Sequence, residues 1–384
     1  MPKTIAITPS WYWPAGIPRV SGTPPFSIYE LCVLRNERDH PNDIAMIDGS
    51  TSLTFGELRH EVDVRARALA LAADESRKAV LPGELTFENV LHLLAGLAAR
   101  VQLRISPPGV DPLSLGSLVA GTAITGGASD ATPLPPAAPD TNALPAVAID
   151  GAEAVVLHSN RSLLAAAISM MTFLDARRGR PWLATLPLSR WEGLMSALIP
   201  LYLGSPLVIP PLRSGPDDLL GLVSQHQAGY LAGDLEEVAT ATREAKRAAK
   251  DARRVLEAAV LAVDGPFDPD QRRRVAKGLE CAALTFWGMP ETGPVFASHS
   301  SWYMDESVGI PMTNAHVVPS DPRSGQPIQA LWELVESAEV TVFSPSLMCG
   351  YEDADATSRF AGHRFRTGMI ASSDANGMIY LLGD

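Results

Sequence analysis

The sequence predicts an α/β fold of layered α/β subdomains, followed by a small β-rich unit. Three observations lead to this prediction. Strand-like and helical stretches alternate from residue 44 to about residue 290, a Pro- and Gly-rich segment interrupts the alternation at residues 107–146, and short β-rich runs dominate after residue 300. Repeated strand–helix units are typical of a largely parallel sheet, whereas short strands separated by Gly, Pro, Asp and Ser favour an antiparallel one.

The first 25 residues are expected to form an extended arm. They are rich in Pro, Gly and Ser and contain three consecutive aromatic residues, Trp11, Tyr12 and Trp13. We expect these rings to pack the arm against the rest of the molecule. The segment lacks an apolar core followed by a cleavage site, so it does not predict a signal peptide.

Residues 26–146 are predicted to form the first α/β subdomain. Helices are expected at residues 27–39, 55–72 and 85–99, and strands at 44–48 and 101–105. Thr54 and Glu57 have the spacing of a capping box at the start of the second helix. Residues 107–146 read as a Pro- and Gly-rich linker.

Residues 147–300 are predicted to form a second α/β subdomain, and residues 301–384 a β-rich, barrel-like one. The segment from Gly193 to Leu212 carries no charge. It contains Pro200, Pro206 and Pro210, which a membrane-spanning helix would tolerate poorly. A helix, a turn and a buried strand are therefore expected there, and no membrane span.

Composition excludes several classes of function. The formal net charge is −12 and the pI is near 5.2, which argues against binding to nucleic acid. The basic cluster at residues 243–254 alternates with Ala and Glu and is interpreted as a solvated helix face. Cys32, Cys281 and Cys349 are far apart and match no metal-binding spacing, which favours a reducing cytoplasm as the location.

Four stretches in order resemble one superfamily. They are His40–Ala70, Val155–Ala167 with Leu186–Pro211, Thr285–Val295 (TFWGMPETGPV), and Ser344–Asp384, which includes HRFRTGM. Together they are similar to the adenylate-forming enzymes: acyl-CoA synthetases (AMP-dependent synthetases and ligases), adenylation domains and luciferases. Such enzymes activate a carboxylate with MgATP to an acyl-adenylate and usually pass it to a thiol.

The resemblance implies a fold of the acyl-CoA synthetase N-terminal domain type and a set of site residues. The implied cofactor-binding positions are Trp287, Gly288, Glu291, Thr367 and Asp264, and the implied substrate-pocket positions are Arg190 and Trp191. Trp287 stands where the family stacks an aromatic ring on adenine. Glu291 stands where the family holds Mg²⁺.

Most of these residues also have a purely structural interpretation. Trp287 can be a buried core aromatic, and Glu291 can brace a turn. Arg190 can be an ordinary ion-paired residue rather than a partner for a ligand carboxylate. Asp264 can be a turn residue. The sequence leaves both interpretations open.

Three departures from the family pattern bear on ATP. The segment before Val155, where a Lys-ending phosphate loop is expected, has no Lys and offers Asp150 and Glu153 instead. Met369 replaces an Asp that would accept the ribose hydroxyls, and a thioether accepts hydrogen bonds poorly. The chain ends at Asp384, near the family hinge, so the C-terminal lid domain is expected to be absent.

We therefore expect a pseudoenzyme that does not adenylate and serves as a ligand-binding or partner subunit. No cofactor is predicted with certainty, and ATP or AMP with Mg²⁺ would bind weakly. The expected ligand is an acyl or aryl carboxylate, and the expected partner is another protein. Two alternatives remain open: an acyl- or aryl-CoA ligase working with a separate C-terminal domain, and a structural subunit of a larger assembly.

Overall fold

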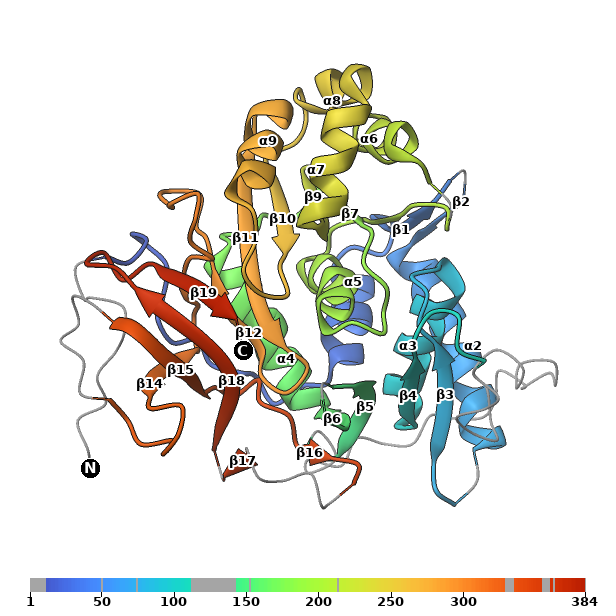
Figure 1. Cartoon of the computed structure of the whole chain (residues 1–384). Coiled ribbons are helices and arrows are strands. Elements are labelled where there is room, and N and C mark those ends of the chain that lie inside the picture. The colour runs from blue at the N-terminus through green and yellow to red at the C-terminus, as the bar shows by residue number, and fades with distance from the viewer. Residues whose placement is uncertain are drawn as a thin grey trace.

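The computed structural model describes most of the chain (Figure 1). The described residues are 12–49, 51–73, 75–111, 143–151, 153–212, 214–328, 335–353, 360–361 and 363–383. Trp11, most of the predicted linker and Asp384 lie outside these ranges.

The largest sheet is mixed, and its central strands are parallel. Its order is β13-β12-β11-β10-β9-β7-β8-β1-β2. The strands are β1 (Ile44–Asp48), β2 (Thr51–Thr54), β7 (Trp182–Ala184), β8 (Leu207–Ile209), β9 (Tyr230–Asp234), β10 (Ala258–Ala262), β11 (Ala282–Met289), β12 (Gly293–Ala297) and β13 (Ile310–Pro311). Only β2, β12 and β13, at the two ends of the order, pair antiparallel. The buried, almost uninterrupted apolar strands β8 and β10 are typical of a sheet covered on both faces.

The second sheet has the order β16-β6-β5-β4-β3. Its strands are β3 (Lys78–Pro82), β4 (Gln102–Ser106), β5 (Pro145–Asp150), β6 (Val155–Ser159) and β16 (Gly350–Tyr351). Strands β3, β4 and β5 are parallel, and β5 and β6 form an antiparallel hairpin. Strands β1 and β2 join strands of residues 182–311 in the largest sheet, whereas β5 pairs with β4 and links the β5–β6 hairpin to the second sheet.

The third sheet is antiparallel, in the order β14-β15-β18-β17, with β19 also paired to β18. Its strands are β14 (His316–Ser320), β15 (Val335–Phe343), β17 (Phe360–Ala361), β18 (Arg364–Ser373) and β19 (Ile379–Gly383). The predicted β-rich region is confirmed. In the described residues these strands do not close into a barrel.

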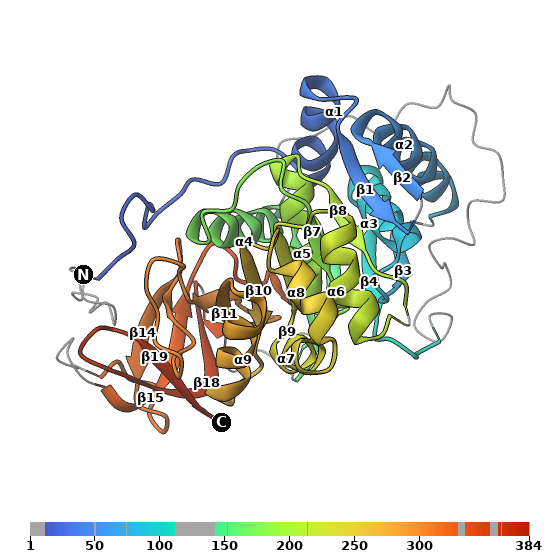
Figure 2. The same ribbon diagram turned by 90° about the horizontal axis from the view of Figure 1, so that it is seen from above.

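Helices cover both faces of the largest sheet. The described helices are a π-helical turn (Glu30–Leu34), α1 (Arg35–Asp39), α2 (Phe55–Ala72), α3 (Phe87–Ala99), α4 (Asn160–Phe173), α5 (Trp191–Leu203), α6 (Pro216–Gln225), α7 (Leu235–Glu244), α8 (Lys246–Ala252) and α9 (Pro269–Leu279). In Figure 2, α4 and the group α6–α9 lie on opposite sides of the largest sheet.

Local sequence signals place several of these elements as predicted. The Thr54 hydroxyl accepts a hydrogen bond from the Glu57 N–H at 3.3 Å, and the Glu57 carboxylate accepts one from the Thr54 N–H at 2.8 Å. Helix α5 ends at Gly204, whose φ of 68° suits glycine, and β8 follows, as expected for the uncharged segment. None of the described helices has the length and apolarity needed to cross a bilayer.

The described part of the arm packs by its aromatic rings, as predicted. The Tyr12 hydroxyl donates to the Trp302 carbonyl at 2.8 Å, and the two rings meet edge to face. Trp13 packs edge to face against Phe173, with 5.6 Å between ring centroids. Figure 2 shows the arm running over the body toward α1.

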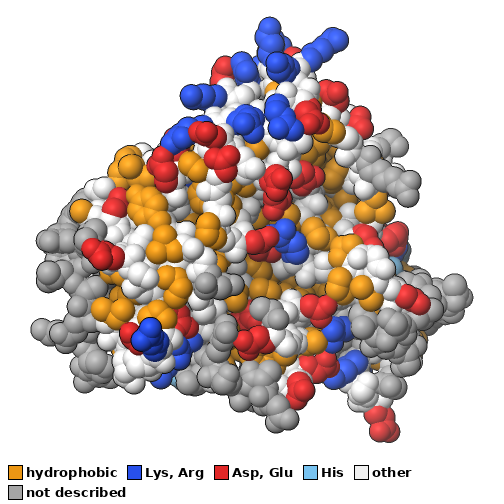
Figure 3. Space-filling model, in the orientation of Figure 1, with side chains coloured by type: hydrophobic (Ala, Val, Ile, Leu, Met, Phe, Trp, Pro, Cys, Tyr) orange, Lys and Arg blue, Asp and Glu red, His pale blue; other side chains and the backbone are white. Residues whose placement is uncertain are grey.

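The basic cluster also lies where expected, on solvent-exposed helices. Arg243, Lys246, Arg247 and Lys250 are exposed. They belong to two helices rather than one, because α7 ends at Glu244 and α8 begins at Lys246. Figure 3 shows the resulting group of basic side chains at the top of the molecule, where Figure 1 places α8.

Candidate functional site

A cavity of about 270 Å³ lies at the carboxyl ends of β10 and β11. Ligands of parallel α/β sheets bind at this end of the strands. Its wall brings together five of the predicted site residues, Arg190, Trp191, Asp264, Trp287 and Gly288, together with Met369. We call this cavity the cleft.

Arg190 is surrounded by carboxylates. Its Nη2 lies 2.7 Å from Asp264 Oδ1, its Nε 3.2 Å from Glu192 Oε2, and its Nη1 3.6 Å from Asp234 Oδ2. Glu192 is buried in the first turn of α5, and burial raises the pKa of its carboxyl group, although Arg190 opposes this rise. Arg190 is therefore an ion-paired residue in this structure.

Two of these three acids, Asp234 and Glu192, were not predicted from the sequence. Asp234 ends β9 and caps α7 through a hydrogen bond from the Glu236 N–H, so its position at a strand end was a usable signal. Glu192 follows Arg190 by two positions at a helix start. Neither feature is specific enough in a sequence to identify a site residue.

The aromatic wall of the cleft is closely packed. Trp287 is 1% exposed, stacks on Phe296 with 5.6 Å between centroids, and donates its indole N–H to the Asp264 carbonyl at 3.4 Å. A Cβ atom at Gly288 would lie 2.1 Å from the Gly293 carbonyl oxygen and 2.8 Å from the Trp191 ring. Glycine is therefore required there by the backbone approach of β11 and β12, whatever the ligand.

Glu291 and Thr367 do not line the cleft. Glu291 is 1% exposed; its Oε1 accepts a hydrogen bond from the Tyr351 hydroxyl at 3.4 Å, and its carbonyl accepts one from the Met348 N–H at 2.9 Å. The Thr367 hydroxyl donates to the Val340 carbonyl at 2.8 Å, within the third sheet. The Glu291 carboxylate thus contacts Tyr351 of the second sheet, and the Thr367 hydroxyl contacts the backbone of the third sheet.

The residues present do not fit the triphosphate of ATP. Strand β5 ends at Asp150 and β6 begins at Val155, and between them the Gly151 N–H already donates to the Ala154 carbonyl at 3.0 Å. Phosphate sites need several free N–H groups and a cation. Asp150 instead presents a carboxylate, paired with Arg104 at 2.7 Å.

Arg190 is the one cation among the described residues of the cleft wall. Within the described ranges, no three His, Cys, Asp or Glu side chains gather as metal ligands. Glu291, where the resemblance implies Mg²⁺, is thus not part of a three-ligand cluster in this part of the chain.

A buried histidine joins the cleft to the second sheet. His158 of β6 has its Nε2 2.6 Å from the carbonyl oxygen of Pro290, which lines the cleft, and its Nδ1 3.1 Å from Ser162 Oγ. Burial lowers the pKa of His158 to about 4, so the ring is neutral at pH 7. A neutral ring can donate Nε2–H to Pro290.

Comparisons with known proteins agree with this architecture. The search found no matching curated protein. Unliganded O-succinylbenzoate coenzyme A synthetase (MenE) from Bacillus subtilis aligns with a TM-score of 0.78 at 17% identity, over 92% of this chain and 79% of that chain. A putative long-chain-fatty-acid CoA ligase from Rhodopseudomonas palustris gives 0.78 at 19%, over 94% and 99%.

A long-chain-fatty-acid-CoA ligase (FadD1) from Archaeoglobus fulgidus gives a TM-score of 0.81 at 13% identity, over 97% of this chain and 86% of that chain. At these identities the likeness establishes the fold of the acyl-CoA synthetase N-terminal domain. The sequence itself matches the family of AMP-binding enzymes over residues 151–352, more than half of the chain. The resemblance to this superfamily is thereby confirmed, and the chain belongs to the AMP-binding enzyme family of the adenylate-forming superfamily.

Proposed function

We propose that this chain is a non-adenylating member of the AMP-binding family, whose cleft binds a small ligand without activating it with ATP. The observation that carries this proposal is the contact of Arg190 with three carboxylates. A cation in such surroundings has no positive charge left to offer a phosphate.

Electrostatics give the size of this effect. Two unit charges about 4 Å apart interact by about 4 kcal/mol at the effective dielectric typical of a protein surface. A phosphate reaching Arg190 would gain one such attraction. It would also meet repulsion from Asp234, Asp264 and, when ionised, Glu192, so its net interaction is unfavourable.

The cleft nevertheless keeps the features of a ligand site. Trp191, Trp287, Met289 and Met369 give it an apolar and aromatic wall. Its volume of about 270 Å³ is near the lower end of ligand pockets, so the ligand is small. The surplus of carboxylates favours a neutral or cationic aryl or acyl compound, because a free carboxylate would compete with three acids for Arg190.

A ligase remains the second candidate. It is favoured by the similarity to MenE, one structure of which is a complex with ATP and magnesium ion. In this case a C-terminal domain would have to supply a cation that is not already paired with carboxylates, as Arg190 is. The structural-subunit alternative is less favoured, because Tyr12 and Trp13 of the arm pack against Trp302 and Phe173 of the same chain.

Calorimetric titration with MgATP, and with AMP for comparison, tests the proposal. We expect no detectable heat at millimolar nucleotide and no pyrophosphate release with a panel of carboxylic acids. Asp264→Asn, which removes a carboxylate whose side chain is 75% exposed, should strengthen MgATP binding, while Asp251→Asn on exposed α8 should not. Micromolar MgATP binding by the unaltered chain, or acid-dependent pyrophosphate release, would establish the ligase instead.

A further inference from the structure

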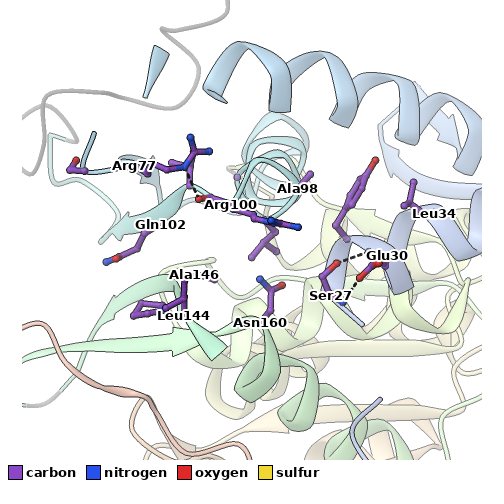
Figure 4. A pocket seen from close by; sticks show the side chains of 16 residues that line it. Ser27, Glu30, Leu34, Arg77, Ala98, Arg100, Gln102, Leu144, Ala146 and Asn160 are labelled. Atoms are coloured by element: carbon purple, nitrogen blue, oxygen red, sulfur yellow. Dashed lines mark hydrogen bonds between the residues drawn. The ribbon is translucent and has the colours of Figure 1, made fainter. Parts of the chain in front are cut away.

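A second, larger cavity of about 430 Å³ lies at the amino-terminal ends of the parallel strands β3, β4 and β5 of the second sheet. Its wall includes the residues that precede or begin β3, β4 and β5, the end of α3, and the segment from Ser27 to Leu34 (Figure 4). It shares no lining residue with the cleft. We call it the rear cavity.

Arg100 lines the rear cavity and ends α3. Its backbone is left-handed, with φ of 56°, at a helix end where glycine is the usual residue. Its guanidinium makes no hydrogen bond or ion pair with any residue that the structure describes. Figure 4 shows the side chain extending from the end of α3 toward Ser27 and Asn160. A cation is thus held in an unfavourable backbone conformation and faces the cavity without a partner.

The charged side chains of the described wall carry more positive than negative charge. Arg77 donates to the carbonyls of Ala99 and Arg100 and brings a second positive charge to the wall. Glu30 is the one carboxylate among the described lining residues, and it accepts a hydrogen bond from the Ser27 N–H at 2.6 Å. With two guanidinium groups against one carboxylate, the described wall has a net positive charge.

A buried amide lies beside Arg100. Asn160 is 6% exposed, and its Oδ1 accepts a hydrogen bond from the Ile28 N–H at 3.3 Å. This contact orients the amide so that its NH₂ group is the donor left for the cavity, where Figure 4 shows the side chain pointing toward Arg100. Arg100 and Asn160 together offer several N–H donors to one anionic group.

Leu34, Leu97, Val101, Leu144 and Ala146 form an apolar part of the wall, and Ser76 and Gln102 also line the cavity. Leu144 is 60% exposed. A cavity of this volume, with polar donors concentrated at one side and apolar side chains elsewhere, has the composition of a small-molecule site. The apolar area would remain in contact with water without a ligand, at a cost proportional to its size.

We propose that the rear cavity binds a small amphiphilic anion. Its carboxylate or phosphate group contacts Arg100 and Asn160, and its hydrocarbon body lies on Leu97, Val101 and Leu144. A planar guanidinium suits either anion, because it can donate two parallel hydrogen bonds. This site is independent of the cleft, so it does not rest on the function proposed there.

The test is calorimetric titration of the whole chain with octanoate and with octyl phosphate, with octanol as the neutral match. Micromolar binding is expected for at least one anion, and the comparison of the two identifies the headgroup. Octanol should bind at least tenfold more weakly, since it lacks the charge-assisted hydrogen bonds. Absence of heat with both anions at millimolar concentration, or equal binding of octanol, would overturn the proposal.

Arg100→Gly is the informative variant. It removes the guanidinium, so we expect at least tenfold weaker anion binding. It also removes the backbone strain of a left-handed arginine, so the melting temperature should be unchanged or higher. Arg254→Gln, on an exposed arginine after α8, should change neither. Asp264→Asn in the cleft should also leave the affinity unaltered. If Arg100→Gly binds octanoate and octyl phosphate as tightly as the unaltered chain, or if Asp264→Asn changes the affinity more, the anion does not bind in the rear cavity.

Discussion

Arg190 in the cleft and Arg100 in the rear cavity form an instructive pair. Both are partly buried arginines beside a helix end, and both face a cavity at a strand edge. Arg190 contacts Glu192, Asp234 and Asp264, whereas Arg100 contacts no carboxylate among the described residues. Of the two, the arginine at the position that the resemblance assigns to the substrate pocket is the one already paired with carboxylates. The presence of a cation therefore predicts anion binding only when its neighbours are known.

The largest expected effect follows from removing Arg190. Arg190→Met leaves the buried Glu192 without its cation, so the free energy of unfolding should fall by about 3 kcal/mol, as measured by urea denaturation. Arg190→Met combined with Glu192→Gln should recover most of this loss, because no buried charge then lacks a partner. A loss below about 1 kcal/mol in the single variant would mean that the cluster is as weak as an exposed ion pair, and that Arg190 is freer than its contacts indicate.

An intermediate effect is expected from acid acting on His158, which connects the second sheet to the cleft through the Pro290 carbonyl. His158 titrates near pH 4 when folded and near 6.5 when unfolded, so the unfolded chain binds more protons between these values. Stability should be complete above pH 6.5 and fall by about 2 kcal/mol at pH 5 from this residue alone. His158→Gln keeps a donor for the Pro290 carbonyl and should flatten the slope by that amount in denaturation measured at several pH values. Equal slopes would show that His158 is accessible to protons in the folded state.

The smallest expected effect is a gain in stability. Arg100→Gly should raise the free energy of unfolding by about 0.5–1 kcal/mol, because glycine adopts the left-handed conformation without steric cost. Arg100→Ala, which keeps a Cβ atom, provides the matched control and should give little gain. If the two variants are equally stable, the backbone at Arg100 is unstrained, and the contrast with Arg190 would rest on its lack of partners alone.

Local features of the fold could be predicted from the sequence. The Thr54–Glu57 capping box, the helix and strand within Gly193–Leu212, and the antiparallel third sheet depend on residues close together in the chain. The convergence of Arg190, Trp191, Asp264, Trp287 and Gly288 was also expected from the resemblance. The pairing of β1 with β8 depends on which hydrophobic strands meet in space, and periodicity does not record it.

The arrangement of side chains in the cleft and the rear cavity could not be predicted from the sequence. The sequence left two interpretations of Arg190, and the choice depended on Asp234 and Asp264, each more than forty positions away. Glu291 and Thr367 lie in family motifs, yet they point into the structure around the cleft rather than into its wall. The rear cavity was not predicted, because it is assembled from five separate segments with no motif among them.

The pairing of early strands with strands made much later also determines when the protein can fold during synthesis. Strand β1 leaves the ribosome early and forms a hairpin with β2, but its other neighbour, β8, is made only at residues 207–209. At the usual 5–20 residues per second, one edge of β1 stays open for roughly 10–30 s. An open apolar edge invites pairing with other nascent chains. We expect the growing chain to depend on chaperones during this interval, and β6 to wait longer still for β16 at residues 350–351.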